Sequence, residues 1–75
     1  GAYLFMTPTC PNCKIAETLL QQAGVRYEKM AAEEHADLVR QYAIMQAPTL
    51  IVNTADGVQK FVSVPEIRQY VAQNM

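Results

Sequence analysis

The chain has 75 residues, 51% of them hydrophobic, and a formal net charge of −1 at pH 7. This length and composition suit one small folded domain, which we place at residues 1–75. The sequence has no basic cluster of the kind that binds nucleic acid and no apolar run near the roughly 20 residues that span a bilayer, so we expect neither a nucleic-acid nor a membrane partner.

The first predicted elements are a strand and a helix that begins beside the cysteines. Residues 2–6 form an uninterrupted apolar run, which is typical of a central strand buried on both faces. Residues 11–23 carry apolar side chains at helical spacing, and Gly24 follows where glycine commonly ends a helix. The only two cysteines, Cys10 and Cys13, therefore fall at the start of this helix.

The middle of the chain is expected to form a second strand and a second helix. Residues 25–30 alternate apolar and charged side chains, which indicates a half-exposed strand parallel to the first. Residues 33–42 have a helical pattern, in which His35 is expected to be a solvated first-turn residue because no partner cluster surrounds it. The buried stripe of this helix is expected to be Leu38, Val39 and Tyr42.

A hairpin is predicted next. Pro48 precedes residues 49–52, which are strong β formers, and residues 58–62 alternate and should pair back on them. The loop between these strands contains Asp56-Gly57, a common turn signal.

A final helix over residues 64–74 completes the predicted order. Ser63 and Glu66 fit a capping box at its start, with Ser63 as the N-cap. The order strand, helix, strand, helix, strand, strand, helix predicts an α/β fold with helices on both faces of a mixed four-stranded sheet. The residues of this helix expected to face the core are Ile67, Tyr70 and Val71.

The motif Cys10-Pro11-Asn12-Cys13 lies between a strand and a helix, a context in which C-x-x-C indicates a redox pair. Pro11 suits the first helical position because its missing N–H would have no intrahelical acceptor there. The helix start and Lys14 favour a thiolate on Cys10, and such settings lower a cysteine pKa from about 8.5 to roughly 3.5–7.5. Cys13 shares that helical face, so it can attack a mixed disulfide formed on Cys10.

Two other interpretations of the cysteine pair remain open. Half of a structural zinc site would need two further ligands, and only His35 and carboxylates could supply them. A purely structural disulfide would close a very short loop and would constrain the unfolded chain little. We expect a redox pair and no metal site.

The C-P-x-C motif after the first strand, with Pro48 opening the third, resembles the thioredoxin superfamily at its small glutaredoxin size, over the whole chain. The resemblance implies a thioredoxin-like, three-layer fold and dithiol–disulfide exchange, with Cys10 as nucleophile and Cys13 as resolving cysteine. It also implies a cis peptide bond before Pro48, which would face the sulfurs. The residues expected to contact substrate are Thr9, Pro11, Asn12, Ala47 and Pro48.

The chain departs from the glutaredoxin pattern where glutathione binds. Glutaredoxins usually carry Lys or Arg at the position of Thr7, and losing it removes a charge-assisted hydrogen bond worth about 1.5–3 kcal/mol. They usually have a Gly-Gly pair after the last strand, whereas residues 61–64 contain no glycine, and Asn12 replaces a common tyrosine. We therefore expect weakened glutathione binding and no cofactor beyond the redox-active disulfide.

These features predict a monomeric, cytoplasmic protein oxidoreductase without a signal peptide, since cysteines at redox spacing with none left for bridges are typical of a reducing cytosol. Gln46-Ala47-Pro48 is similar to a segment of the small glutaredoxin-like electron donors of ribonucleotide reductase, which makes that enzyme a candidate client. The reductant would be a thioredoxin reductase or glutathione. The alternatives are a glutathione-dependent glutaredoxin and a non-catalytic binding or assembly domain on the same fold.

Overall fold

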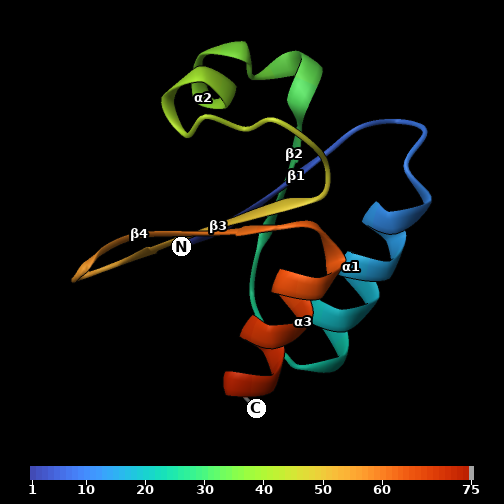
Figure 1. Ribbon diagram of the computed structural model, residues 1–75, viewed down its shortest axis with the longest axis vertical. Helices are drawn as coiled ribbons and strands as arrows, with labels where there is room; N and C mark the ends of the chain where they lie inside the picture. The colour runs from blue at the N-terminus through green and yellow to red at the C-terminus, as the bar shows by residue number, and fades with distance from the viewer. Residues whose placement is uncertain (75) are drawn as a thin grey trace.

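The computed structural model describes residues 1–74, which form a mixed sheet with helices on both faces (Figure 1). The strand order is β2-β1-β3-β4, in which β1 and β2 are parallel and the other pairs are antiparallel. The predicted fold class and order of elements are confirmed. The elements are β1 (Ala2–Met6), α1 (Pro11–Gln22), β2 (Glu28–Ala31), the 3-10 helix η1 (Ala32–Glu34), α2 (Ala36–Gln41), β3 (Thr49–Thr54), β4 (Gly57–Val62) and α3 (Ser63–Gln73).

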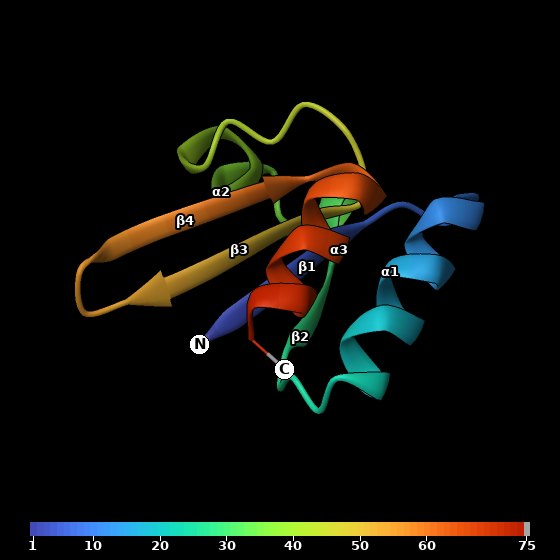
Figure 2. The same ribbon diagram turned by 60° about the horizontal axis from the view of Figure 1, so that its bottom comes forward.

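The main core lies between the sheet and the layer formed by α1 and α3, which run side by side in Figures 1 and 2. Alternate residues of a strand point to the same face, so Leu4 and Leu50, which are paired across β1 and β3, both enter this core. Leu20 of α1 and Ile67 of α3 meet them and are fully buried. This packing fixes the direction of α1 and therefore the place of its first turn.

The opposite face of the sheet is covered by α2. Phe5 is fully buried there, and its ring lies 6.3 Å from that of Tyr42 in an edge arrangement. The predicted helix 33–42 is wrong in its extent, because His35 has φ −133° and ψ 52°, which breaks the helix into η1 and the short α2. Two expectations fail as a result: His35 is half-buried rather than solvated, and the predicted stripe is only half-buried. The members of that stripe are Leu38, Val39 and Tyr42.

Two strand boundaries also differ from the prediction. The N–H of Val25 donates to the carbonyl of Leu20 at 3.0 Å, which closes the end of α1, so β2 begins only at Glu28. The β3–β4 hairpin is longer than predicted and turns through Ala55-Asp56, because Gly57, with φ 131°, already pairs with Thr54.

The capping box predicted for α3 is only half formed. Glu66 accepts a hydrogen bond from the N–H of Val62 at 2.7 Å, but Ser63 is not the N-cap and its side chain makes no cap bond. Ser63 instead has φ 67° and donates its N–H to the carbonyl of Pro48 at 2.9 Å. The start of α3 is thus tied to the start of β3.

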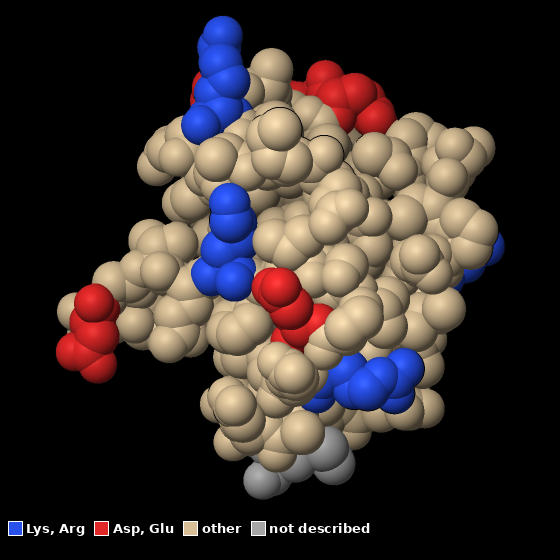
Figure 3. Space-filling view, in the orientation of Figure 1, with Lys and Arg blue, Asp and Glu red and all other residues tan. Residues whose placement is uncertain are grey.

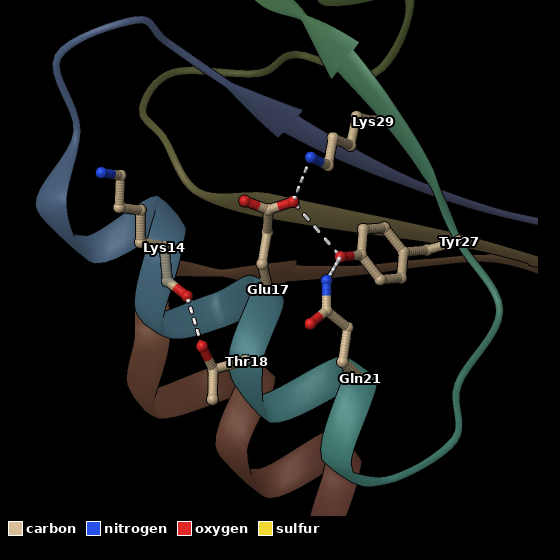
Figure 4. Close-up of polar contacts among 6 residues, drawn as sticks. All are labelled: Lys14, Glu17, Thr18, Gln21, Tyr27 and Lys29. Atoms are coloured by element: carbon tan, nitrogen blue, oxygen red, sulfur yellow. Dashed lines mark hydrogen bonds and ion pairs between the residues drawn. The ribbon is translucent and has the colours of Figure 1, made fainter.

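A polar cluster joins α1 to β2 (Figure 4). Glu17 accepts from the ammonium of Lys29 at 2.9 Å and from the hydroxyl of Tyr27 at 3.3 Å, and Gln21 donates to that hydroxyl at 3.1 Å. The hydrogen bond and the negative charge of Glu17 raise the pKa of Lys29. The cluster fastens the exposed edge of the sheet to the helix that carries the cysteines.

The charged side chains on the face in Figure 3 are scattered, and a wide uncharged area separates them. Within residues 1–74, no helix combines the length and the apolar character needed to cross a membrane.

Candidate active site

The cysteine pair lies at the N-terminus of α1, as predicted. Cys10 is the N-cap residue, with φ −138° and ψ 94°, and Pro11 takes the first helical position. The N–H of Cys13 lies 3.1 Å from Sγ of Cys10 and 3.1 Å from its carbonyl oxygen. The two cysteines form a disulfide, and their Cα atoms are 5.3 Å apart. A sulfur therefore takes the place that a Ser or Asp oxygen fills in ordinary helix caps.

The two sulfurs of this disulfide lie in different surroundings. Cys13 is 1% exposed, because its side of α1 faces the sheet, whereas Cys10 is only half-buried. The neighbouring Thr9, Pro11 and Asn12 are exposed. A partner can reach the pair from the side of Cys10, and an N–H group is already directed at that sulfur.

Lys14 borders the same opening. It is exposed and lines a shallow hollow together with Thr9, Cys10 and Pro11. Figure 4 shows its ammonium directed away from Glu17, which pairs with Lys29 instead. Within residues 1–74 Lys14 forms no ion pair, so its positive charge remains beside the cysteine hollow.

The peptide bond between Ala47 and Pro48 is cis, which confirms this part of the prediction. Pro48 is fully buried, and its carbonyl accepts the hydrogen bond from Ser63. Ala47 is half-buried, and neither its N–H nor its carbonyl has a hydrogen-bond partner within residues 1–74. Figures 1 and 2 both place this segment beside the loop that leads into α1. The backbone N–H and carbonyl of Ala47 are therefore unpaired within residues 1–74, close to the loop that leads into α1.

Sequence reasoning missed two features of this region. The first is the bond between Ser63 and Pro48, which no local pattern signals because the two residues are far apart in the chain. The second is Met45, which is 88% exposed in the segment before Pro48. An exposed methionine beside a predicted substrate segment could have drawn attention, since methionine is common at adaptable binding surfaces.

No cluster of three or more His, Cys, Asp or Glu side chains within residues 1–74 could hold a metal ion. The zinc interpretation of the cysteines therefore has no ligand set among the described residues. The chemistry that this arrangement can perform is thiol–disulfide exchange, because the cysteine pair itself accepts and donates two electrons.

Solved structures with the same fold include thioredoxins and a thioredoxin-like protein. The thioredoxin-like protein BC3987 has 25% sequence identity, a TM-score of 0.71 and complete coverage of both chains. Thioredoxin from Trypanosoma brucei brucei has 19% identity and a TM-score of 0.75, over 96% of this chain and 71% of its own. Thioredoxin 1 from Thermosipho africanus has 17% identity and a TM-score of 0.72, over 95% and 85%. The comparison with curated proteins gave no match.

Fold and cysteine pair together define the class, a thiol–disulfide oxidoreductase of the thioredoxin superfamily. A family model for glutaredoxins matches residues 3–55, which is more than half of the chain and includes both cysteines and Pro48. The chain belongs to the glutaredoxin family.

Proposed function

We propose that this protein reduces disulfides in client proteins by a dithiol mechanism that needs both Cys10 and Cys13. The observation that carries the proposal is the disulfide at the start of α1, in which Cys10 is half-buried and Cys13 is 1% exposed. Such an arrangement separates the attacking from the resolving thiol. The reacting cysteine is the one that a client can reach.

The reaction has two exchange steps. The Cys10 thiolate attacks one sulfur of the client disulfide, a new S–S bond joins them, and the second client sulfur leaves as a thiolate. The Cys13 thiolate then attacks Sγ of Cys10, forms the intramolecular disulfide and releases the first client sulfur. The client gains two electrons, and the dithiol loses two. The N–H of Cys13, 3.1 Å from Sγ of Cys10, and the positive end of α1 stabilise the thiolate on Cys10.

The neighbouring residues take supporting roles in this proposal. Lys14 adds positive charge that favours the thiolate, and its place in the cysteine hollow supports this role. The exposed residues Thr9, Pro11 and Asn12 form the surface that a client meets first. The free backbone groups of Ala47 pair with an extended client segment, as in β-strand addition, and Pro48 holds Ala47 in place.

Glutathione is a poor reductant in this proposal. Two backbone donors where β4 meets α3, in the region where glutaredoxins usually have a Gly-Gly pair, are already used: Val62 donates to the Glu66 carboxylate and Ser63 to the carbonyl of Pro48. The Glu66 carboxylate would also repel an anionic ligand at this place. Thr7 supplies no cation on the other side of the site. A protein dithiol, such as a thioredoxin reductase, would then reduce the disulfide, and ribonucleotide reductase would be one client of a monomeric, cytoplasmic donor.

The test is insulin reduction with dithiothreitol as electron source, comparing the wild-type protein with Cys10→Ser and Cys13→Ser. We expect catalysis by the wild type, none by Cys10→Ser, and a trapped mixed disulfide but little turnover by Cys13→Ser. Absence of catalysis by the wild type would instead support a non-catalytic binding or assembly domain.

A glutathione-dependent glutaredoxin is the second candidate, and the family match favours it. The two candidates separate with a glutathionylated substrate and glutathione as reductant. A monothiol-capable glutaredoxin would keep full activity in Cys13→Ser. The dithiol proposal expects low activity from the wild type and still less from this variant.

A further inference from the structure

One polar side chain is buried on the face of the sheet that α2 covers. Thr49, the first residue of β3, is 1% exposed and is the only buried polar residue among residues 1–74. It is paired with Phe5 across β1, and Ile51 follows it on the same face; both are apolar and fully buried. Valine has nearly the shape of threonine and would fill this position without a hydroxyl group that must be hydrogen-bonded. The packing of the sheet therefore gives no reason for a hydroxyl at this position.

The hydroxyl of Thr49 bonds to the segment that precedes β3. Its Oγ1 donates to the carbonyl of Gln46 at 2.7 Å. This carbonyl and the N–H of Ala47 belong to one peptide unit, which is planar and trans. In a trans peptide the carbonyl and the N–H point in opposite directions, so the N–H of Ala47 points away from the buried hydroxyl.

A second hydrogen bond holds the chain on the other side of Ala47. The carbonyl of Pro48 accepts from the N–H of Ser63 at 2.9 Å. The residues on both sides of Ala47 thus have bonded carbonyls, whereas the N–H and the carbonyl of Ala47 have no partner within residues 1–74. These two groups are the ones that pair with the client in the proposed function.

We propose that Thr49 is a positioning residue for client binding, which acts through the peptide unit between Gln46 and Ala47. This inference rests on the proposed function and adds a residue whose buried side chain does not reach the client. The hydroxyl keeps the N–H of Ala47 directed outward before the client arrives, so less binding free energy is lost in ordering the segment. Without the hydroxyl the peptide unit can rotate, and the affinity falls with the fraction of molecules in which the N–H is directed outward.

The experiment follows single-turnover oxidation of the reduced protein by an excess of a disulfide. The oxidant is either a short synthetic peptide with an internal disulfide or bis(2-hydroxyethyl) disulfide, which has no main chain to pair with Ala47. Cys10 and Cys13 become a disulfide, and the oxidant gains two electrons and two protons as it becomes two thiol groups. Acid quenching and mass spectrometry give the limiting rate and the KM for the peptide, and the second-order rate constant for the small disulfide.

Thr49→Val should raise the KM for the peptide about three- to tenfold, with the limiting rate and the rate with the small disulfide within about twofold of the wild type. Thr49→Ala also lacks the hydroxyl and should raise the KM by the same factor. Thr49→Ser loses a buried methyl group and should unfold at lower urea concentration, yet it should keep the KM of the wild type because it keeps the hydroxyl. A role of Thr49 in stability alone would not separate the variants in this way.

Thr54→Val is the matched control. The hydroxyl of Thr54 also donates to a carbonyl three residues away, that of Gly57 at 2.9 Å, but this bond lies in the exposed hairpin. The same substitution at this place should leave the KM for the peptide unchanged.

Four results would each overturn the inference. These are an unchanged KM in Thr49→Val, an equal rise of the KM in Thr49→Ser, an equal rise in Thr54→Val, and an equal loss of rate by Thr49→Val with the small disulfide. In each case the wild type still reduces the peptide, so the proposed function survives. If the wild type does not reduce the peptide, the proposed function itself is refuted, and this inference with it.

Discussion

The two faces of the sheet are built differently. On the α1/α3 face, residues from two strands and two helices are fully buried in one apolar cluster, including Leu4, Leu20 and Ile67. On the α2 face, Phe5 and Ile51 of the sheet are fully buried, but α2 itself contributes no fully buried residue. Its six residues depend on contacts such as the Phe5–Tyr42 ring pair and on the backbone N–H of Tyr42, which donates to the carbonyl of Leu38 at the C-terminal end; His35 makes no side-chain cap bond at the other end.

The two faces of the sheet therefore support different parts of the site. The α1/α3 face holds the helix that carries Cys10 and Cys13, and exchange chemistry needs these sulfurs in a fixed geometry. On the α2 face, the segment before Pro48 lines a hollow of about 160 Å³ together with residues of β1, η1 and α2, and the proposed function places the client at this segment. Regions with few buried apolar contacts open most easily, so the client side of the site is expected to be the more adaptable.

The largest expected effect comes from a cavity in the well-packed face. Leu20→Ala should lower the free energy of unfolding by about 2–5 kcal/mol, because Leu20 is fully buried. Val39→Ala removes apolar atoms from the half-buried face of α2 and should cost only about 1 kcal/mol. Urea unfolding followed by circular dichroism measures both. Equal losses would show that the two faces are packed alike and would end the comparison.

The second effect concerns the two cysteines, which both lie at the start of α1 but differ in exposure to solvent. In reduced single-cysteine variants at pH 7, iodoacetamide should modify Cys10 at least about thirtyfold faster than Cys13, since a thiol is only a few per cent thiolate unless its surroundings favour the anion. Cys13 is also 1% exposed. Alkylation rates of Cys13→Ser and Cys10→Ser give the ratio directly. Similar rates would contradict the assigned roles.

A smaller effect should follow from a charge placed at Thr7, on the side of the site that α2 supports. Thr7→Lys puts an ammonium at the hollow, where glutaredoxins usually have a cation, and Thr7 is exposed, so folding should tolerate it. We expect a two- to fivefold gain, at most about 1 kcal/mol, in kcat/KM with a glutathionylated substrate, because exposed ion pairs contribute little. The matched variant Thr7→Gln should give no gain. No change in Thr7→Lys would mean that its cation does not reach glutathione.

The smallest effect tests how α2 is held. Lys60 of β4 donates to the carbonyls of Tyr42 and Ala43, each at 3.2 Å, and so places a cation at the C-terminal end of α2. Lys60→Met should lower the free energy of unfolding by about 0.5 kcal/mol. Hydrogen exchange should also rise in α2 more than in α1. Arg68→Met removes the same charge from the exposed side of α3 and is the control; uniform changes in both variants would refute a local role for Lys60.

Local signals in the sequence were sufficient to predict α1 and the position of the cysteines at its start. Cys10 at the N-cap, Pro11 at the first helical position and Gly24 beyond the end were predicted because each depends on neighbours within one or two turns. The order of elements followed from periodicity in the same way. The cis bond before Pro48 followed from the resemblance and not from the residues themselves.

The failures occur where distant segments meet. The pattern over residues 33–42 predicted one helix, whereas η1 follows β2 directly and the chain leaves helical geometry at His35, which has φ −133° and ψ 52°. Serine is a residue type that favours the N-cap position. The N–H of Ser63 instead donates to the carbonyl of Pro48, fifteen positions earlier in the chain, and Ser63 has φ 67°. A hydrogen bond to the residue before the neighbouring strand β3 outweighed a local preference worth about 1 kcal/mol.

By itself, the sequence determined the redox pair. The reactivity of two cysteines at the start of a helix depends mainly on that helix end, which neighbouring residues in the sequence specify. Only the tertiary structure decided what surrounds that chemistry. It buried Cys13 against the sheet, occupied the N–H groups of Val62 and Ser63, and joined Thr7, Val39 and Ala47 into an uncharged hollow. The physical reason is that these contacts join residues far apart in the chain, and their geometry exists only after the sheet has brought the segments together.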